Sequence, residues 1–398
     1  MLNDRINKYK RAVVSQLASG SPGAIWKGAI AELDGLRGIA IFLVFIVHWW
    51  PSPNPQSWSW QYVKTGWVGV DLFFVISGFL ICGILMDTCK DAHYYRNFYA
   101  RRTLRIFPLY YAFLIVVFTF IPLGQGGGYF QTPFLKESGS PVWYFCYLSN
   151  FALILHECPF LLVPLWSLAI EEQFYICFPF LVAVLNHNRL WKLIIGIIFA
   201  ALLFRIITYL LFPEIGVQLQ RAATPARMDA IAWGGLLAVG LRTGRFQYSP
   251  RASTVLLVST FAVAIWAFYA GWLNHNLPYG RTISYTIIGA VFFTVLLWTL
   301  LHRDRMATVF LRFPPLQYLG KICYGSYILH RVAEGLLVKT IRAFGMVENP
   351  ESVLLFMGKV GTTVVLASIS WFLFERPILK LKDRFTSTHH PEGALTVS

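Results

Sequence analysis

The segment LRGIAIFLVFIVHWW, residues 36–50, is an almost unbroken apolar run that contains two ionisable side chains, Arg37 and His48. Ionisable residues at membrane depth are costly, so they usually mark a pathway or a reactive centre. Eleven residues at about 100° each make roughly three full turns, which places both side chains on one helix face, about 16 Å apart along the axis. The segment therefore predicts a membrane helix with a candidate reactive site.

Composition extends this prediction to the whole chain. The 398 residues are 56% hydrophobic and only 13% charged, about half the charge of an ordinary soluble domain. We predict an all-α polytopic bundle of about ten transmembrane helices, because that many apolar runs are long enough to cross a bilayer. The runs cover residues 36–50, 67–86, 105–122, 165–185, 191–212, 228–241, 253–273, 282–301, 318–341 and 352–374. The stretch 142–155 is shorter and predicts an interfacial or re-entrant piece, although a further span is an alternative.

The net charge of +15 reflects membrane topology on this interpretation. With the N-terminus inside, most basic residues fall on the cytoplasmic side, which is the positive-inside pattern and places the C-terminus there too. The inner clusters are Arg101, Arg102 and Arg105; Arg242, Arg245 and Arg251; Arg303, Arg305 and Arg312; and Lys380, Lys382 and Arg384. Nucleic acid is therefore not an expected partner, and the lipid bilayer is.

The chain divides into three parts on this view. Residues 1–30 form a basic cytoplasmic tail that lacks the long apolar core of a signal peptide and suits an anionic lipid surface. Residues 31–382 form the membrane domain, and residues 383–398 a disordered cytoplasmic tail. Cys146 and Cys158 share an outer loop and could pair in an oxidising compartment, but separate thiols are the preferred interpretation. No metal site is expected, because HExxH-like spacing is absent.

Several ionisable residues are expected at similar depth, towards the outer ends of their helices: His48, Asp71, Glu171 with its neighbour Glu172, and Arg205. Convergent charge at one level predicts a shared polar cavity. A neutral imidazole can remove a proton from a hydroxyl or accept an acyl group itself. Glu171 or Asp71 could orient it, as a carboxylate orients the base of a catalytic triad.

Simpler interpretations compete with this one. His48 beside two tryptophans could anchor the helix at the interface. Asp71 and Glu171 could serve only to neutralise Arg205. Arg37 could extend its side chain to lipid phosphate groups of the inner leaflet.

A second cationic feature lies in the loop before the third run. Arg102 and Arg105 are three residues apart, so on a helix they share one face. Arginine forks suit phosphate groups. A phosphate-bearing ligand or lipid headgroups could occupy this face.

Five sequence blocks resemble, in order, those of the membrane acyltransferase-3 family. The blocks are Arg37-X10-His48 within LDGLRGIA (residues 33–40), GVDLFFVISGFL (69–80), Arg102-X2-Arg105 followed by IFPLY (106–110), Ser167-X3-Glu171-X3-Tyr175, and FERP (374–377). Together they extend over nearly the whole chain. Any one would be weak evidence, but five in order are specific.

The resemblance implies an integral membrane O-acyltransferase. Its donor would be a cytoplasmic acyl-CoA, most often acetyl-CoA, and its acceptor a hydroxyl of an extracytoplasmic glycan. His48 would be the catalytic histidine, with Glu171 and Asp71 as its candidate carboxylates. Arg37, Arg102 and Arg105 would hold the CoA end, and a pantetheine arm is comparable to the ~16 Å between Arg37 and His48 along a helix.

The remaining roles concern the substrates. Glu171 and Tyr175 would shape the acyl or acceptor site, Ser167 is a further candidate for substrate binding, and Arg205 could hold an acidic acyl group. The enzyme would be a multi-pass protein of the cell membrane, the inner membrane in a Gram-negative bacterium. Some relatives carry an appended soluble esterase-like domain, so a separate soluble partner could complete the transfer.

One block departs from the family pattern. In YGSYILHRV, residues 324–332, Ile328 replaces a leucine and Val332 replaces a proline. The helix is expected to be less kinked as a result, and His330 is interpreted as a packing histidine.

Two alternatives remain open at this point. The chain could acylate a cytoplasmic small molecule such as a macrolide. It could instead be a glycolipid or anion transporter, although the symmetric repeats common in transporters are not apparent.

Overall fold

The computed structural model describes residues 30–51, 63, 65–124, 133–156, 158–212, 214–246, 249–273, 278–303, 305–345 and 352–385. Helices and turns account for this part of the chain, and no strand occurs in it, so the all-α prediction is confirmed there. The predicted basic tail lies outside the described residues except for Ile30. Residues 383–385, expected to begin a disordered tail, still belong to a 3₁₀ turn.

Ten helices in the described ranges have 18 residues or more. They are α2 (Ala31–Trp49), α4 (Val68–Thr88), α5 (Tyr94–Gly124), α9 (Leu165–Val184), α10 (His187–Leu211), α12 (Thr224–Arg242), α13 (Pro250–Tyr269), α14 (Pro278–Leu301), α16 (Cys323–Ala343) and α17 (Val353–Ser370).

The shorter elements are α6 (Pro133–Ser138), α7 (Val142–Phe145), α8 (Ser149–Leu155), α11 (Gly216–Ala222), α15 (Pro314–Lys321), α18 (Arg376–Leu379), the 3₁₀ turns η2 (Thr65–Trp67), η4 (Met306–Arg312) and η6 (Lys380–Phe385), and the π-helical turn η5 (Trp371–Glu375).

Seven helices are long and apolar enough to cross a membrane, so our count of about ten is not confirmed. The long helices outside this set are α2, α12 and α16. Each carries several charged residues, such as Arg227 and Asp229 in α12 or Arg331 and Glu334 in α16. Charged residues lower the mean hydropathy of a helix even when their side chains are paired inside the protein.

The short stretch 142–155 does not form a further span, and one predicted run is divided in the structure. The stretch 142–155 forms α7 and α8, each far shorter than the roughly 20 residues that a helical span requires. The run 318–341 is interrupted at Ile322, where α15 ends and α16 begins. Pro314 and Pro315 start α15, consistent with proline at the first helical positions.

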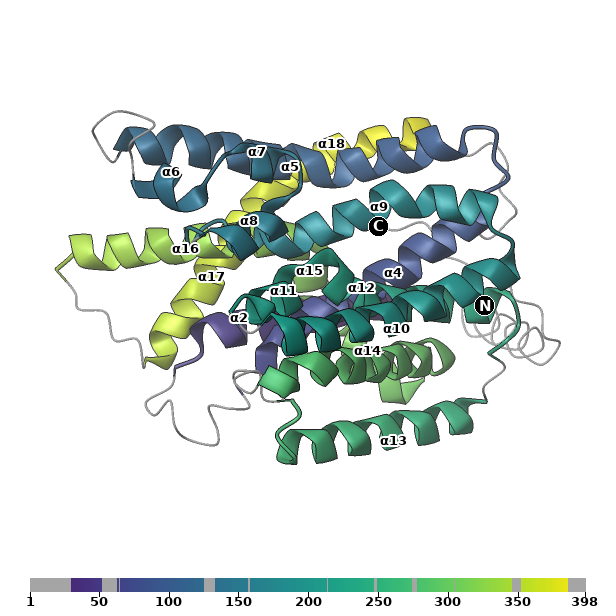
Figure 1. Cartoon of the computed structure of the whole chain (residues 1–398). Coiled ribbons are helices and arrows are strands. Elements are labelled where there is room, and N and C mark those ends of the chain that lie inside the picture. Colours follow the sequence, from purple (N-terminus) through teal and green to yellow (C-terminus); the bar gives the residue numbers. More distant parts are fainter. Residues whose placement is uncertain are drawn as a thin grey trace.

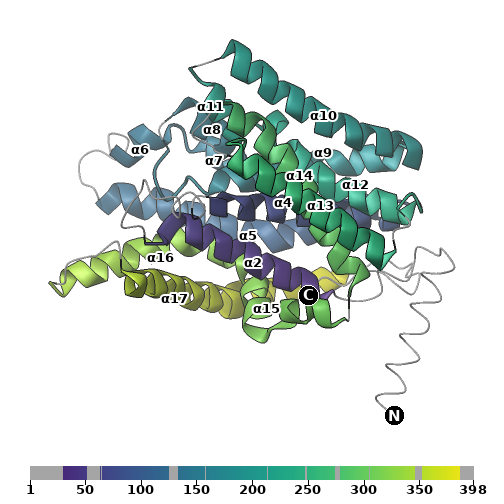
Figure 2. The ribbon, with the colours of Figure 1, turned by 90° about the horizontal axis from the view of Figure 1, so that it is seen from below.

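The bundle has a buried centre and a lipid-accessible periphery. In α4, 72% of the apolar window is buried, whereas in α13 only 11% is. Figure 1 shows α13 at one edge of the bundle, next to α14. Viewed from below, α16 and α17 lie together on one side and α10 on the other, with α2, α4 and α12 between them (Figure 2).

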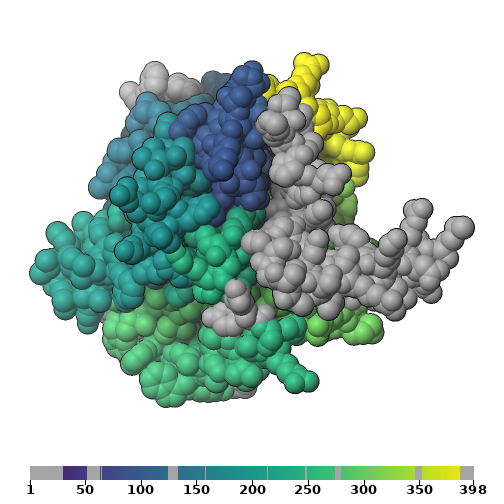
Figure 3. Space-filling view, turned by 90° about the vertical axis from the view of Figure 1, so that its right-hand side faces the viewer, coloured from purple at the N-terminus to yellow at the C-terminus, as the bar shows by residue number. Residues whose placement is uncertain are grey.

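The C-terminal segment packs against the start of α5. Both α18 and η6 contact α5, and Figure 3 views this end of the bundle, with α5 in blue beside the C-terminal segment in yellow. The FERP block lies at the turn into α18, where Ser370 Oγ donates to Glu375 Oε1 at 2.8 Å. The last block therefore fixes the end of α5 that carries Arg102 and Arg105.

Two glycines allow α4 and α12 to approach closely. A Cβ atom on Gly78 would lie 1.9 Å from the Ile231 carbonyl oxygen, and one on Gly234 would lie 1.9 Å from the Val75 carbonyl oxygen. Both contacts are far below van der Waals distance and involve rigid backbone. Small residues at such positions let membrane helices pack backbone to backbone.

Replacing Gly234 by alanine is expected to lower the free energy of unfolding by about 1–3 kcal/mol, because the added methyl forces α4 away from α12. Thermal unfolding of the purified protein in detergent measures the effect. Gly361→Ala is the matched control, since a Cβ atom there meets nothing within 4 Å. Equal stability of the two variants would contradict close packing at Gly234.

Candidate functional site

Two cavities lie end to end in the centre of the bundle. The first, here called the arginine cavity, has a volume of about 100 Å³. The second, the histidine cavity, has a volume of about 280 Å³. Val70 and Tyr327 line both, so these two residues form the boundary between them. Of the charged residues expected in one shared cavity, Glu171 lines the first and His48 the second, whereas Asp71 and Arg205 line neither.

The arginine cavity collects the three arginines that the sequence singled out. Its polar lining consists of Arg37 of α2, Arg102 and Arg105 of α5, Ser77 of α4, Ser167, Glu171, Glu172 and Tyr175 of α9, and Cys323, Tyr324 and Tyr327 of α16. Residues from the N-terminal halves of α2, α5 and α16 meet at this end of the bundle, which we call the arginine end.

A carboxylate and an aromatic ring contact two of these arginines. Arg37 Nη1 donates to Asp34 Oδ1 at 2.7 Å. The Arg102 guanidinium lies 5.6 Å from the centre of the Tyr175 ring, a cation–π distance. The cavity is therefore cationic at its arginine end, with a wall of apolar and aromatic side chains beyond it.

Glu171 belongs to the arginine cavity rather than to His48. Ser77 Oγ donates to Glu171 Oε1 at 2.8 Å, and Glu171 is absent from the lining of the histidine cavity. The neighbouring Glu172 also lines the arginine cavity, and its Oε1 has no hydrogen-bond partner in the described part of the chain. The predicted contact between Glu171 and the imidazole does not occur in this structure.

His48 lies at the opposite end of α2, in the histidine cavity. The Val44 carbonyl hydrogen-bonds to its ring, and the His330 ring lies 5.1 Å away, centroid to centroid, in an edge-to-face arrangement. Residues from the ends or starts of α2, α9, α12 and α14 meet here, together with Arg221 of α11. We call this the histidine end.

Asp71 does not reach His48 either. Asp71 Oδ1 accepts a hydrogen bond from Arg227 Nη2 at 2.8 Å, and both side chains are buried. Arg227 lines the histidine cavity and its guanidinium lies 3.6 Å from the centre of the Tyr285 ring. Asp71 therefore stands behind the cavity wall and holds Arg227 within it, instead of orienting the imidazole.

Arg205 lies outside both cavities. Its guanidinium donates to Asp229 Oδ2 at 2.7 Å and to the Thr282 carbonyl at 2.9 Å, with further bonds to Thr286 Oγ1 and the Ala226 carbonyl. These contacts join α10, α12 and α14. The structure thus gives Arg205 a packing role, and its partner is Asp229 where the sequence suggested Asp71 or Glu171.

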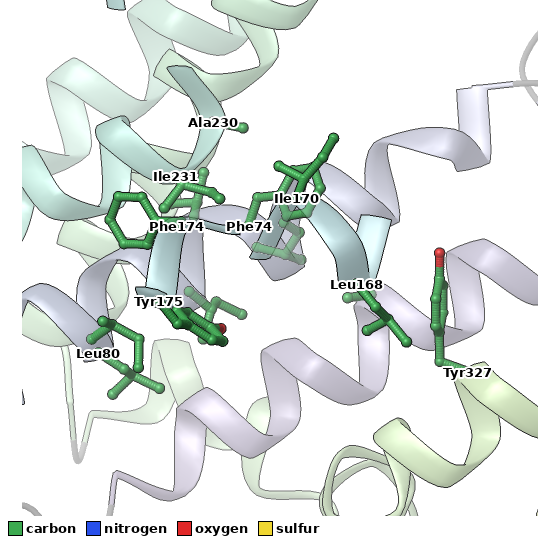
Figure 4. Close-up of a cluster of buried hydrophobic side chains, with 14 of the residues drawn as sticks. Phe74, Leu80, Leu168, Ile170, Phe174, Tyr175, Ala230, Ile231 and Tyr327 are labelled. Atoms are coloured by element: carbon green, nitrogen blue, oxygen red, sulfur yellow. The ribbon is translucent and has the colours of Figure 1, made fainter. Parts of the chain in front are cut away.

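Tyr327 separates the two cavities. Its hydroxyl lies 2.7 Å from Ser167 Oγ and 3.0 Å from the Pro164 carbonyl oxygen, to which it donates. Figure 4 shows Tyr327 of α16 facing Leu168 of α9, with Tyr175 farther along α9. Ser167 thus lies at the inner boundary of the arginine cavity, whereas Tyr175 lies nearer its arginines.

His330 is both a packing residue and a neighbour of His48. Its Nδ1 lies 2.7 Å from the Tyr327 carbonyl oxygen, which requires a proton on Nδ1, and its Nε2 has no partner in the described part of the chain. The hydrogen bond within the bundle agrees with the interpretation of His330 as a packing histidine. Its contact with His48 was not anticipated.

Cys323 lines the arginine cavity, whereas the other cysteines line neither cavity. Cys146 and Cys158 are both free thiols, and burial raises the pKa of the Cys158 thiol, which lies 3.4 Å from the Tyr144 hydroxyl. Within the described ranges, no three or more His, Cys, Asp or Glu residues are grouped as a metal site.

Several lining residues were not singled out from the sequence. Arg227 could have been found, because a charged residue within a predicted span usually marks a functional or paired position. Tyr327 belongs to the block that departs from the family pattern. Arg221 and Arg281 follow no recognisable motif, since they lie near the ends of separate helices that only the fold brings together.

Comparison with known proteins agrees with the motifs. A family model described as "Acyltransferase domain" matches residues 30–372. "Peptidoglycan O-acetyltransferase OatA" of Listeria monocytogenes is 27% identical over 373 residues, which is 88% of this chain and 56% of that protein. "O-acetyltransferase OatA" of Staphylococcus aureus is 26% identical over 369 residues, 87% of this chain and 57% of that protein.

The chain thus spans somewhat more than half the length of these curated relatives. No solved structure matches it. The matched region includes both cavities, from Arg37 to Tyr327.

Replacing Arg205 by glutamine is expected to destabilise the protein by about 3–5 kcal/mol, because Asp229 is left buried without its ion-pair partner. The double variant Arg205→Gln with Asp229→Asn is expected to recover much of this loss. Thermal unfolding of the two variants measures it. If the Arg205→Gln protein has normal stability but no longer binds substrate, the result would instead support the role predicted from the sequence, in which Arg205 holds an acidic acyl group.

Proposed function

The chain belongs to the membrane acyltransferase-3 family, and from this premise we propose that it transfers an acyl group, most often acetyl, from acyl-CoA to a hydroxyl of a glycan. The observation that carries the proposal is the pair of adjoining cavities, one with three arginines and the other with a histidine. The glycan acceptor is inferred from the relatives whose names specify peptidoglycan.

The arginine cavity suits the donor. Guanidinium groups bind phosphate through paired N–H donors, and Arg37, Arg102 and Arg105 supply three at one end of the cavity. A cavity of about 100 Å³ is well below the size of a typical ligand pocket. It suits an extended pantetheine arm, with the nucleotide outside at the arginine end.

The histidine cavity suits the acceptor. The distance along α2 from Arg37 to His48 is about 16 Å, comparable to the reach of that arm. The thioester carbonyl would then lie near Tyr327 and Ser167, where the cavities adjoin, and the acceptor hydroxyl would approach from the histidine end.

His48 is the proposed general base. It removes the proton from the acceptor hydroxyl as that oxygen bonds to the thioester carbonyl carbon. The carbon–sulfur bond breaks, and the proton passes to the departing thiolate, which gives free CoA and the new ester. The hydrogen bond that the imidazole donates to the Val44 carbonyl and the packing of His330 would hold the ring in position.

We place the arginine end at the cytoplasm and the histidine end at the outer face of the cell membrane, because basic clusters gather at the arginine end. All ten long helices would cross the membrane, including α2, α12 and α16. Arg227 and Asp229 of α12 are buried, and in α16 Arg331 pairs with Glu334, whereas Lys339 and Arg342 are exposed near its C-terminal end. Acylation would then use a cytoplasmic donor for an external acceptor.

His48→Ala is expected to reduce acceptor-dependent release of CoA from acetyl-CoA by at least about a hundredfold, the usual contribution of a general base. The assay uses purified protein in nanodiscs and a thiol reagent that reports free CoA. His93→Ala, at an exposed position before α5, is the control. Full activity of the His48 variant with normal folding would end the proposal.

Arg105→Ala is expected to raise the KM for acetyl-CoA by about ten- to a hundredfold, as the loss of a hydrogen bond to a charged group implies. The exposed Arg96 of the same helix provides a matched control, Arg96→Ala. The difference in KM between the Arg105→Ala and Arg96→Ala variants should shrink as ionic strength rises, because salt screens the contact with phosphate. An unchanged KM for the Arg105 variant would exclude phosphate binding at this position.

A further inference from the structure

The histidine cavity carries an excess of positive charge. Besides His48, its lining contains Arg221, Arg227 and Arg281, and among the described residues that line it there is no aspartate or glutamate. Asp71, behind the wall, neutralises Arg227. In the described structure neither Arg221 nor Arg281 forms an ion pair, so about two positive charges remain uncompensated beside the base.

Arg227 is also incompletely satisfied. Its side chain is only 2% exposed, and its Nη2 donates to Asp71, but Nε and Nη1 have no hydrogen-bond partners in the described structure. Buried charged donors without partners are costly, so a protein seldom retains them without a ligand or water to accept their hydrogen bonds. Arg227 lines a cavity large enough to admit such a group.

The three arginines are arranged from the rim of the cavity towards its interior. Arg221 is exposed on α11, Arg281 is half-buried near the start of α14, and Arg227 is buried near the start of α12. Arg221 and Arg281 lie close enough to repel each other electrostatically. An anionic group between them would relieve this repulsion and could also reach the free donors of Arg227.

We infer that the molecule acylated beside His48 carries a carboxylate that these arginines bind. The inference rests on the proposed function and specifies its substrate class: an acidic sugar rather than a neutral one. The gradient from rim to interior favours the acceptor as the carrier of the charge, because the acceptor enters from the histidine end. A dicarboxylic acyl group, such as succinyl, would offer the same chemistry from the donor side.

Binding measured without an acyl donor tests the inference apart from catalysis. The probes are a hyaluronan tetrasaccharide, which carries two glucuronates, and its methyl ester, which has the same hydroxyl groups but no charge. The acid is expected to bind full-length protein in nanodiscs at least tenfold more tightly than the ester. Microscale thermophoresis at low and high salt gives both dissociation constants, and salt should reduce the difference.

Two variants assign the preference to this cavity. Arg281→Gln should remove most of it, whereas the exposed Arg251→Gln on α13, which lines neither cavity, should leave it unchanged. Thermal unfolding checks that both variants are folded. Equal binding of acid and ester, or a preference that Arg281→Gln does not alter, would overturn acceptor recognition here.

A second pair of probes covers the donor side. Succinyl and propionyl thioesters of N-acetylcysteamine differ in a terminal carboxylate. If the succinyl thioester binds more tightly than the propionyl thioester, and Arg281→Gln removes this difference while the tetrasaccharide pair shows none, the carboxylate belongs to the acyl group. If neither pair of probes shows a difference that depends on Arg281, the inference fails. If the unsubstituted protein releases no CoA in the catalytic assay but still binds the acid more tightly than its methyl ester, the proposed reaction is refuted and this binding site remains.

Discussion

Asp71 and Arg227 meet between α4 and α12, 2.8 Å apart, where neither side chain has appreciable access to solvent. Two residues farther along α12, Asp229 pairs with Arg205 of α10. Residues two apart on a helix differ by about 200°, so the two pairs fall on opposite sides of α12. A buried charge without its partner is severely destabilising, and these pairs therefore fix the neighbours that α12 can have. The close approach at Gly78 and Gly234 provides the short distance that the Asp71 pair requires.

The position of α12 has a direct consequence for the site. Because Asp71 holds only one edge of the Arg227 guanidinium, the remaining donors are available to the histidine cavity. The carboxylates considered as partners of His48 have other tasks: Asp71 supports Arg227, and Glu171 accepts a hydrogen bond from Ser77 in the arginine cavity. The nearest ring to His48 described here belongs to His330, so the imidazole is positioned by packing and a backbone carbonyl.

Dividing the polar residues between two cavities separates the requirements of the two proposed substrates. The smaller arginine cavity combines cationic groups with an apolar wall, which suits a phosphate-bearing molecule with a thin arm. The larger histidine cavity offers aromatic and cationic groups, which suit a polar acceptor. Tyr327, whose hydroxyl is hydrogen-bonded to Ser167 and to the Pro164 carbonyl, lies at the boundary between the two adjacent cavities. This arrangement would limit the access of water to a thioester that lies on the arginine side.

Local sequence was sufficient to identify a helical membrane protein, its family and the three arginines that gather in one cavity, because hydropathy, helical spacing and short motifs are encoded in neighbouring residues. Arg37, Arg102 and Arg105 could be grouped by motif although α2 and α5 lie far apart in the chain. The depth of each ionisable residue was a weaker guide: it suggested that His48, Asp71, Glu171 and Arg205 meet, whereas each has different partners. Depth specifies a position along a helix axis but not the direction in which a side chain points. Helix rotation and neighbour choice depend on contacts between distant segments, and only the tertiary structure decided that Arg221, Arg227 and Arg281 line the same cavity as His48.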